Sequence, residues 1–170
     1  AELFSPDAGY PLYHLLLKAW VALAGDSEWA LRFPSALAGA AAVVAVYLAA
    51  AEVARSAGAG PRASALSDAE GWPARARALL PAVFVALSPF ALWHAQDAKA
   101  YSLLLLVVAL ELWALLRALR REDARAWLLV LALALASLFV HRLALLSASG
   151  VALAYALTRG RLAAGDLPRP

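Results

Sequence analysis

The stretch from Pro34 to Ala54 decides the fold of this chain and reads PSALAGAAAVVAVYLAAAEVA. Its charged residue is Glu52, close to its end. About 21 helical residues, at roughly 1.5 Å rise per residue, cover a bilayer hydrocarbon core, which is roughly 30 Å thick. A proline does no harm in the first turn of a helix, because the N–H that it lacks has no intrahelical partner there. The stretch therefore predicts a membrane-spanning helix that begins at Pro34.

The rest of the chain is similarly apolar. Hydrophobic residues make up 64% of the 170 residues and charged residues 16%, and the mean hydropathy is +0.71. A soluble domain of this size could not bury so much apolar surface. Four further runs have the length of short spans: Ala78–Trp93, Ala100–Leu116, Trp127–His141 and Leu143–Thr158. The sequence thus predicts an all-α, multi-pass transmembrane bundle of about five spans over residues 34–158.

The last two runs meet at His141 and Arg142, where no glycine or proline marks a turn. A single helix from Trp127 to Thr158 would extend to roughly 50 Å, which is longer than a bilayer is thick. Two antiparallel spans are therefore predicted here.

Residues 1–33 are predicted to form an extracytoplasmic loop with one interfacial helix. The run from Pro11 to Ala24 is too short to cross a bilayer. Tyr10, His14 and Lys18 recur at every fourth position, so they share one face, while leucines occupy another. Such an amphipathic helix lies along the membrane surface.

Two connections follow from local composition. Gly25 is expected to end the interfacial helix, and Asp26 or Ser27 to cap the next one. The segment Glu52–Arg77 is rich in Ala, Gly, Ser, Pro and Arg and predicts a solvated linker.

Positive charges set the orientation. Eleven of the 15 basic residues fall on the side of the loops 52–77 and 117–125 and the tail 159–170. The other four face the opposite side: Lys18, Arg32, Lys99 and Arg142. The positive-inside rule makes the first side cytoplasmic, including the tail 159–170. The expected location is the cell (inner) membrane, and the basic balance gives no reason to expect a nucleic-acid partner.

Polar residues gather on the predicted outer side. The turn from Trp93 to Tyr101 reads WHAQDAKAY and places an acid, a base, an amide and a cation beside hydrocarbon. Polar groups at such places are costly and tend to be functional. The alternative is that they are ordinary interfacial residues, solvated by water and head groups. Within the spans, Glu111 is expected to pair with an arginine or to reach the interface.

A metal centre has little support in the sequence. His14, His94 and His141 are ligand types for a divalent ion, but they show no HxxxH or HxxEH spacing. The chain has no cysteine, so it can form neither disulfides nor a thiolate site. No certain cofactor is predicted, and a divalent metal ion is left open.

Two passages resemble a known enzyme family. Residues Pro11–Gly39 read PLYHLLLKAWVALAGDSEWALRFPSALAG, and Ser88–Tyr101 read SPFALWHAQDAKAY. They resemble the PPLYY…GxSExALRLPS and SPxxxxxSQEARxY passages of GT-C fold glycosyltransferases of the protein O-mannosyltransferase and aminoarabinose-transferase type. Their order, spacing and predicted membrane side all agree.

The resemblance implies transfer of a sugar from a polyprenyl-phosphate carrier to a glycan, lipid or protein acceptor on the extracytoplasmic face. Cations are needed near the lipid phosphate, and Lys99, Arg142 and Lys18 are the candidates. A carboxylate near the acceptor hydroxyl is needed to take its proton, and Asp97 is the candidate. The remaining residues expected to contact substrate are Tyr13, His14, His94, Gln96, Tyr101 and His141.

The chain also departs from the family pattern. The usual catalytic Asp-Glu pair follows a first transmembrane helix, and neither feature precedes Pro11 here, so Asp7 is held as a substitute. Asp97 replaces a glutamate, and Lys99 replaces an arginine and cannot form a bidentate fork. Because position 1 is not methionine, we expect a fragment or processed product that is inactive alone. The Ala, Leu and Arg bias suggests a bacterial source.

Two alternatives remain open at this point. One is a non-catalytic membrane protein, such as a transporter or scaffold subunit, whose outer turn is a vestibule or docking surface. Charged or discontinuous helices at mid-membrane would favour it. The other is a truncated gene product without activity.

Overall fold

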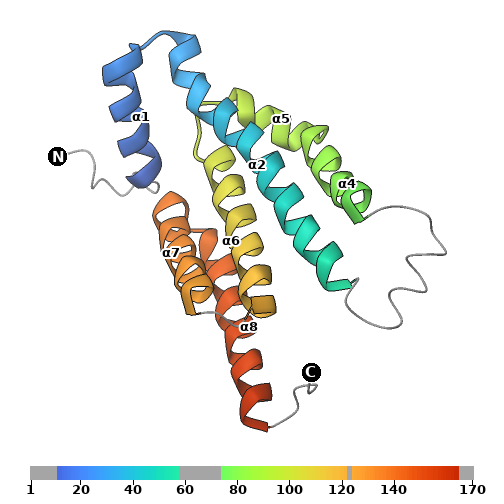
Figure 1. Cartoon of the computed structure of the whole chain (residues 1–170). Helices are drawn as coiled ribbons and strands as arrows, with labels where there is room; N and C mark the ends of the chain where they lie inside the picture. The colour runs from blue at the N-terminus through green and yellow to red at the C-terminus, as the bar shows by residue number, and fades with distance from the viewer. Residues whose placement is uncertain (1–10, 58–73, 122–123, 165–170) are drawn as a thin grey trace.

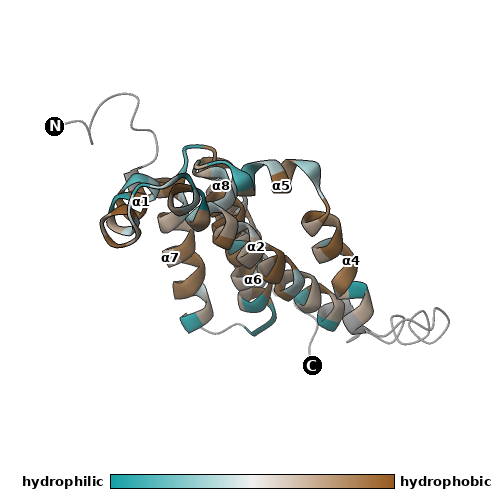
Figure 2. Cartoon of the chain, turned by 90° about the horizontal axis from the view of Figure 1, so that it is seen from above, coloured by the Kyte–Doolittle hydropathy of each residue, from teal (hydrophilic) through white to brown (hydrophobic). Residues whose placement is uncertain are grey.

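A computed structural model describes residues 11–57, 74–121 and 124–164, and every element within these ranges is an α-helix. The helices are α1 (Pro11–Ala24), α2 (Glu28–Ala57), α4 (Ala74–Ala86), α5 (Pro89–Gln96), α6 (Tyr101–Arg121), α7 (Ala124–Val140) and α8 (Ala144–Ala164) (Figure 1). The prediction of an all-α chain is thus confirmed for the described residues. Hydrophilic residues lie mainly at helix ends and connections, with hydrophobic lengths of α4 and α7 between them (Figure 2).

The helices α2 and α6 are long and apolar enough to cross a membrane. A third span results if α4 and α5 count as one bent span. The helices α1 and α7 and the apolar part of α8 are shorter than this. These lengths indicate a membrane protein, while the number of five spans and the interfacial position of α1 stay predictions.

The start of α2 differs from the prediction. The helix begins at Glu28, and Pro34 lies inside it. A proline within a helix leaves the carbonyl four residues earlier without its usual donor. Here that carbonyl belongs to Ala30, and the indole Nε1–H of Trp20 donates to it at 2.8 Å. The prediction that the helix begins at Pro34 is therefore wrong, because α1 supplies the hydrogen bond that the proline removes.

The connection between α1 and α2 follows the predicted chemistry. Gly25 has φ of 81°, a left-handed conformation that glycine adopts without strain. Ser27 Oγ accepts the N–H of Ala30 at 3.2 Å and so caps α2. Of the two predicted capping residues, the structure selects Ser27.

The two long helices pack through small side chains. After Pro34, the buried residues of α2 recur at alternating spacings of three and four, and they are Ser35, Ala38, Ala42, Ala45, Ala49 and Glu52. On α6, the buried Ala109 lies near Ala49 of α2, while Ala114 and Ala118 pack with Ala126 and Val130 of α7. Large apolar side chains such as Val44 and Leu112 point outward, with 58% and 49% exposed. This arrangement is typical of membrane helices, whose backbones approach closely while lipid covers the leucines.

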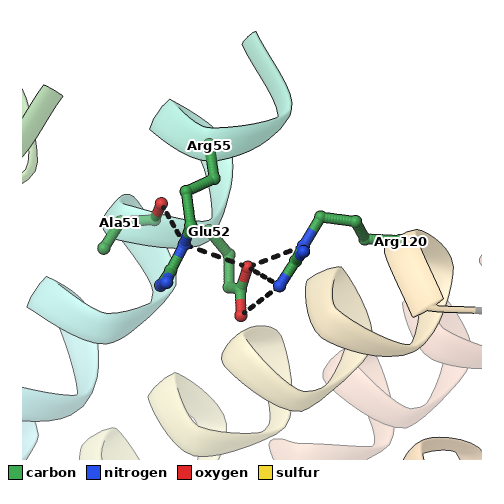
Figure 3. A network of polar contacts seen from close by, with 4 residues as sticks. All are labelled: Ala51, Glu52, Arg55 and Arg120. Carbon is green, nitrogen blue, oxygen red and sulfur yellow. Dashed lines mark hydrogen bonds and ion pairs between the residues drawn. The ribbon is translucent and has the colours of Figure 1, made fainter. Parts of the chain in front are cut away.

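Polar contacts join α2 and α6 at both ends, so the two helices run in the same direction. At one end Ser35 Oγ donates to the carbonyl of Lys99 at 3.3 Å. At the other end, Arg120 Nε donates to the buried Glu52 carboxylate at 3.0 Å, and Arg55 lies 3.4 Å from it (Figure 3). We refer to these as the Lys99 end and the Arg120 end of the bundle.

The predicted linker Glu52–Arg77 is shorter in the structure. The helix α2 continues to Ala57, and α4 begins at Ala74. Glu52 is therefore a buried helical residue, because the arginine partners neutralise its charge and apolar neighbours enclose it. Residues 58–73 lie outside the described part of the chain.

The predicted span Ala78–Trp93 is two helices. The axes of α4 and α5 differ by 56° across a break at Leu87 and Ser88. Pro89 causes the break, since it lacks an N–H and disfavours helical geometry at the residue before it. The helix α5 then packs against α2, where a Cβ added to Gly39 would lie 2.9 Å from the Ala95 Cβ. Glycine at position 39 thus permits the close approach that places the end of α5 beside α2.

Glu111 is placed differently from the prediction. It is 1% exposed, and it pairs with no arginine among the described residues. Instead, Ser147 Oγ of α8 donates to its Oε2 at 3.1 Å. The prediction of an arginine pair or an interfacial position is wrong, because packing of α8 against α6 encloses the carboxyl group at mid-helix.

Candidate functional site

The Lys99 end of the bundle gathers most of the predicted site residues. The end of α5, the start of α6, the first turn of α1 and the turn between α7 and α8 meet there. We call this group the polar cluster, and its members are Tyr13, Ser35, His94, Asp97, Lys99, Tyr101 and His141.

Asp97 and Lys99 form an ion pair across the tight turn between α5 and α6. Lys99 Nζ lies 2.8 Å from Asp97 Oδ2, with 60% and 34% of the side chains exposed. The hydrogen bond from Lys99 holds the pKa of Asp97 below its ordinary value, and the charge of His94 adds a smaller effect. The same hydrogen bond raises the pKa of Lys99. Asp97 is therefore ionised and Lys99 charged at neutral pH, although solvent weakens their attraction.

Ser35 connects α1 to this turn. Its Oγ donates to the carbonyl of Lys99 at 3.3 Å, so the hydroxyl of Tyr13, at 3.3 Å, is the donor in the second contact. Burial raises the pKa of Tyr13, the hydrogen bond with Ser35 opposes this, and the negative charge of Asp97 raises it further. Tyr13 thus lies close enough to sense Asp97 and stays protonated, as a hydroxyl that can orient a substrate.

Aromatic rings form a row beside the turn. His94 lies between Phe90 and Tyr101, with ring centroids 4.4 and 4.6 Å away. Tyr101 in turn contacts His141, with 5.3 Å between centroids. His94 Nδ1 is buried and has no hydrogen-bond partner among the described residues. The row therefore offers apolar ring faces together with an imidazole nitrogen that a ligand can satisfy.

His141 makes the turn that the sequence does not mark. The helix α7 ends at Val140 and α8 begins at Ala144. His141 Nδ1 accepts the N–H of Leu143 at 3.0 Å, and the His141 carbonyl accepts the N–H of Ala144 at 2.9 Å. The histidine side chain thus bonds the backbone two residues on, the role that Asn or Asp usually fills in a turn. The predicted break between the last two helices is confirmed.

The hydrogen bond to His141 Nδ1 predicts a pH-dependent stability. Burial, assisted by the charge of Arg142, lowers the pKa of His141 below 6.5, so the unfolded chain binds more protons than the folded one as the pH falls. Stability present above about pH 6.5 is then lost as the pH drops through the folded pKa. A protonated Nδ1 cannot accept the Leu143 N–H, and one such hydrogen bond contributes about 1 kcal/mol. We expect His141→Asn, which keeps an acceptor but does not titrate, to remove a loss of this order between pH 8 and pH 5.

The measurement is the unfolding midpoint in detergent at both pH values. His14→Asn is the matched control, because His14 is exposed. An unchanged pH dependence in His141→Asn, or an equal change in His14→Asn, would show that His141 does not carry the effect.

Of the other predicted site residues, His14 touches the polar cluster through its ring, whose centroid lies 5.8 Å from that of Tyr13. Among the described residues, none of the following makes a hydrogen bond or ion pair with the polar cluster, and all are exposed: His14, Lys18, Gln96 and Arg142. Asp7 lies outside the described part of the chain. Within residues 11–57, 74–121 and 124–164, no three His, Asp or Glu side chains come together as metal ligands would.

An apolar groove opens beside the polar cluster, between α1, α2 and α6. Its volume is about 430 Å³, within the roughly 300–1,000 Å³ of small-molecule sites. Tyr13 and Ser35 lie in its wall, and the rest is almost wholly apolar: Leu16, Leu17, Trp20, Phe33, Pro34, Leu37, Ala38, Ala41, Leu103 and Leu106. Because Ser35 also contacts Lys99, the groove adjoins the charged turn. The arrangement suits a ligand with an alkyl part and an anionic head.

Comparison with known protein families identifies the family of the chain. The family model described as "Protein O-mannosyl-transferase TMEM260 N-terminal domain" matches residues 5–163. The chain belongs to this family. The mannosyltransferase part of the resemblance is thus supported, and the family match spans all of the described helices except the last residue of α8. No curated protein and no solved structure matches the chain.

Some residues of the site were missed from sequence. Ser35 stands in a matching passage, but nothing in that passage marks it as the contact between Tyr13 and Lys99. Ser102 Oγ donates to the carbonyl of His94 at 2.8 Å and so ties α5 to α6. Both are small polar residues near the starts of apolar helices, and this placement is the signal that could have found them.

Proposed function

We propose that this chain forms part of a membrane O-mannosyltransferase of the GT-C type. It would take a sugar from a polyprenyl-phosphate carrier and pass it to a protein hydroxyl on the extracytoplasmic face. The observation that carries the proposal is the Asp97–Lys99 turn at the mouth of an apolar groove, in a chain of an O-mannosyl-transferase family.

The donor fits this place because both of its parts have a partner. The isoprenoid tail lies in the groove between α1, α2 and α6, whose walls are hydrocarbon. The phosphate approaches Lys99, which is 60% exposed. A solvated ion pair contributes little free energy, so a phosphate can replace Asp97 as the partner of Lys99. Lys18 and Arg142 are further cations on the exposed surface that can assist.

Release from Lys99 leaves Asp97 available to the acceptor. In the transfer, the acceptor oxygen bonds to the anomeric carbon, the bond from that carbon to the phosphate oxygen breaks, and the hydroxyl proton goes to a carboxylate. Asp97 is ionised and near Tyr13, so it can take or share that proton. The ring row of His94, Tyr101 and His141 offers surfaces on which a sugar can stack, and the exposed side chains of Gln96 and His14 are free to contact substrate.

The proposal is tested by following labelled mannose in membranes that contain the whole protein. With polyprenyl-phosphate mannose as the donor, label is expected on Ser or Thr hydroxyls of a protein acceptor and is released by alkaline β-elimination. With nucleotide-linked mannose and no carrier, no label should appear. Equal labelling from both donors would refute a lipid-linked donor, and no labelling in either case would refute the transferase.

One observation favours a second candidate, a non-catalytic transport or scaffold subunit. The α4–α5 pair is a discontinuous helix, and Glu111 is a buried carboxyl at mid-helix. Both features occur in transporters. The break lies beside Pro89, however, and α5 serves to position His94 and Asp97 at the polar cluster. Solute uptake into vesicles without mannose transfer would support this second candidate.

A further inference from the structure

A second groove lies where α2, α4 and α6 meet, in the half of the bundle near the Arg120 end. Its volume is about 430 Å³. Its walls are alanine, valine, leucine and proline side chains, with one charged residue, Arg77 of α4. It shares no lining residue with the groove beside Tyr13. The proposed transfer reaction therefore does not use it.

Arg77 lacks the partners that neighbouring arginines have. Its Nε atom is buried and has no hydrogen-bond acceptor among the described residues. At the same end of the bundle, Arg55 and Arg120 both bind the Glu52 carboxylate. A buried N–H without an acceptor is unfavourable, and such groups in native proteins usually meet a ligand or an ordered water. The groove thus holds a guanidinium that no carboxylate in the described residues satisfies.

The walls of the groove limit the chemistry of the ligand. Val53 and Leu112 are 52% and 49% exposed, so the groove opens on the helix surface that hydrocarbon covers. Free phosphate would find no second polar group in these walls. A neutral alkyl chain would leave Arg77 unsatisfied. An amphipathic molecule with a phosphate at one end and a hydrocarbon chain at the other satisfies both parts, because guanidinium groups bind phosphate oxygens through paired hydrogen bonds.

We propose that this Arg77 groove binds one anionic glycerophospholipid, with its phosphate on the Arg77 guanidinium and an acyl chain between α2, α4 and α6. The net charge of the lipid matters because the exposed Arg121 and the partly exposed Arg55 and Arg120 make this end of the bundle positive. Such basic ends of membrane helices attract anionic head groups. The bound lipid fills the space behind Pro81 and so supports α4 against the two long helices.

The test is native mass spectrometry of the purified protein in a mild detergent, titrated with phosphatidylglycerol or phosphatidylcholine. The wild type is expected to retain one phosphatidylglycerol and to bind it about tenfold more tightly than phosphatidylcholine. Arg77→Gln removes the charge-assisted hydrogen bonds and is expected to weaken phosphatidylglycerol binding about tenfold or more. Arg121→Gln removes the same charge at the same end but outside the groove, and it should change binding less than about twofold.

A third variant tests the groove without touching the charge. Ala50→Leu places a larger side chain in the groove wall and is expected to weaken retention of phosphatidylglycerol about as much as Arg77→Gln. Helix content by circular dichroism confirms folding, and Ala50→Leu carries the test if Arg77→Gln does not fold. Equal retention of both lipids by the wild type would overturn the proposal. So would wild-type binding in folded Arg77→Gln or Ala50→Leu, or an equal loss in Arg121→Gln. Mannose transfer is not part of the readout, so this result is independent of the proposed function.

Discussion

Asp97→Asn and Lys99→Ala are each expected to lower mannose transfer at least about 100-fold in the whole protein, with membrane insertion unchanged. Proton transfer by a positioned carboxylate contributes roughly 10²–10⁴ in rate, and an amide cannot accept the hydroxyl proton. Lys99 adjoins the groove through the contact of its carbonyl with Ser35, so its loss removes an ammonium that would hold the donor phosphate. The measurement is transfer of label from polyprenyl-phosphate mannose, with protein amounts matched by quantitative blotting.

The two variants should differ in their kinetics. Lys99→Ala is expected to raise KM for the lipid donor, because it removes a binding contact, while Asp97→Asn is expected to lower kcat. Lys99→Arg keeps the charge and should retain part of the activity. Arg32→Ala is the control at the same end, since Arg32 pairs with exposed Glu28 and with no other acidic side chain in the described part of the chain. Normal transfer by Asp97→Asn and Lys99→Ala would remove both residues from the mechanism.

Arg120→Leu is expected to destabilise the bundle by about 3 kcal/mol. Glu52 is 1% exposed, and removing one partner of a buried ion pair costs roughly 3–5 kcal/mol because the other charge stays buried. The lower end of this range applies, since Arg55 remains 3.4 Å from the carboxylate. The measurement is the free energy of unfolding in mixed detergent micelles, followed by helix content.

A double variant separates the effect of the ion pair on stability from the effect of side-chain packing. Glu52→Leu combined with Arg120→Leu removes both charges and should recover most of the lost stability, because an apolar pair of similar size needs no desolvation. Arg121→Leu is the control, as Arg121 is exposed beside the same helix end. If Arg120→Leu is no less stable than Arg121→Leu, the Glu52 network does not hold α2 to α6.

The candidate site was predictable in its residue types more than in its contacts. The Trp93–Tyr101 turn carries its chemistry in nine consecutive residues, and a turn between two apolar runs must lie at a bundle end. His14, Lys18 and Arg142 share that end by topology, but topology does not say which side chains touch. All three of these side chains are exposed, while Ser35, which is buried, reaches Lys99.

Some helix boundaries are likewise set by local residues and others by contacts with distant residues. Gly25 and Ser27 act locally, so their roles at the α1–α2 connection could be predicted from residue type. Pro34 and Glu52 could not be placed in this way. Trp20, ten residues from Ala30 in the chain, supplies the donor that keeps Pro34 inside a helix. Arg120, 68 residues from Glu52, supplies the charge that allows this carboxylate to be buried.

The sequence by itself determined that this chain is a set of apolar helices with a polar turn between Trp93 and Tyr101, and its motifs indicated the mannosyltransferase family. Hydrophobicity, proline and glycine act over a few residues, so their effects are visible in one dimension. Only the tertiary structure decided that Tyr13, Ser35 and Lys99 meet beside one groove and that Arg77 lies in the wall of a second groove. These results depend on the distance between neighbouring helices, which small side chains shorten. That distance is a property of pairs of helices rather than of any one segment.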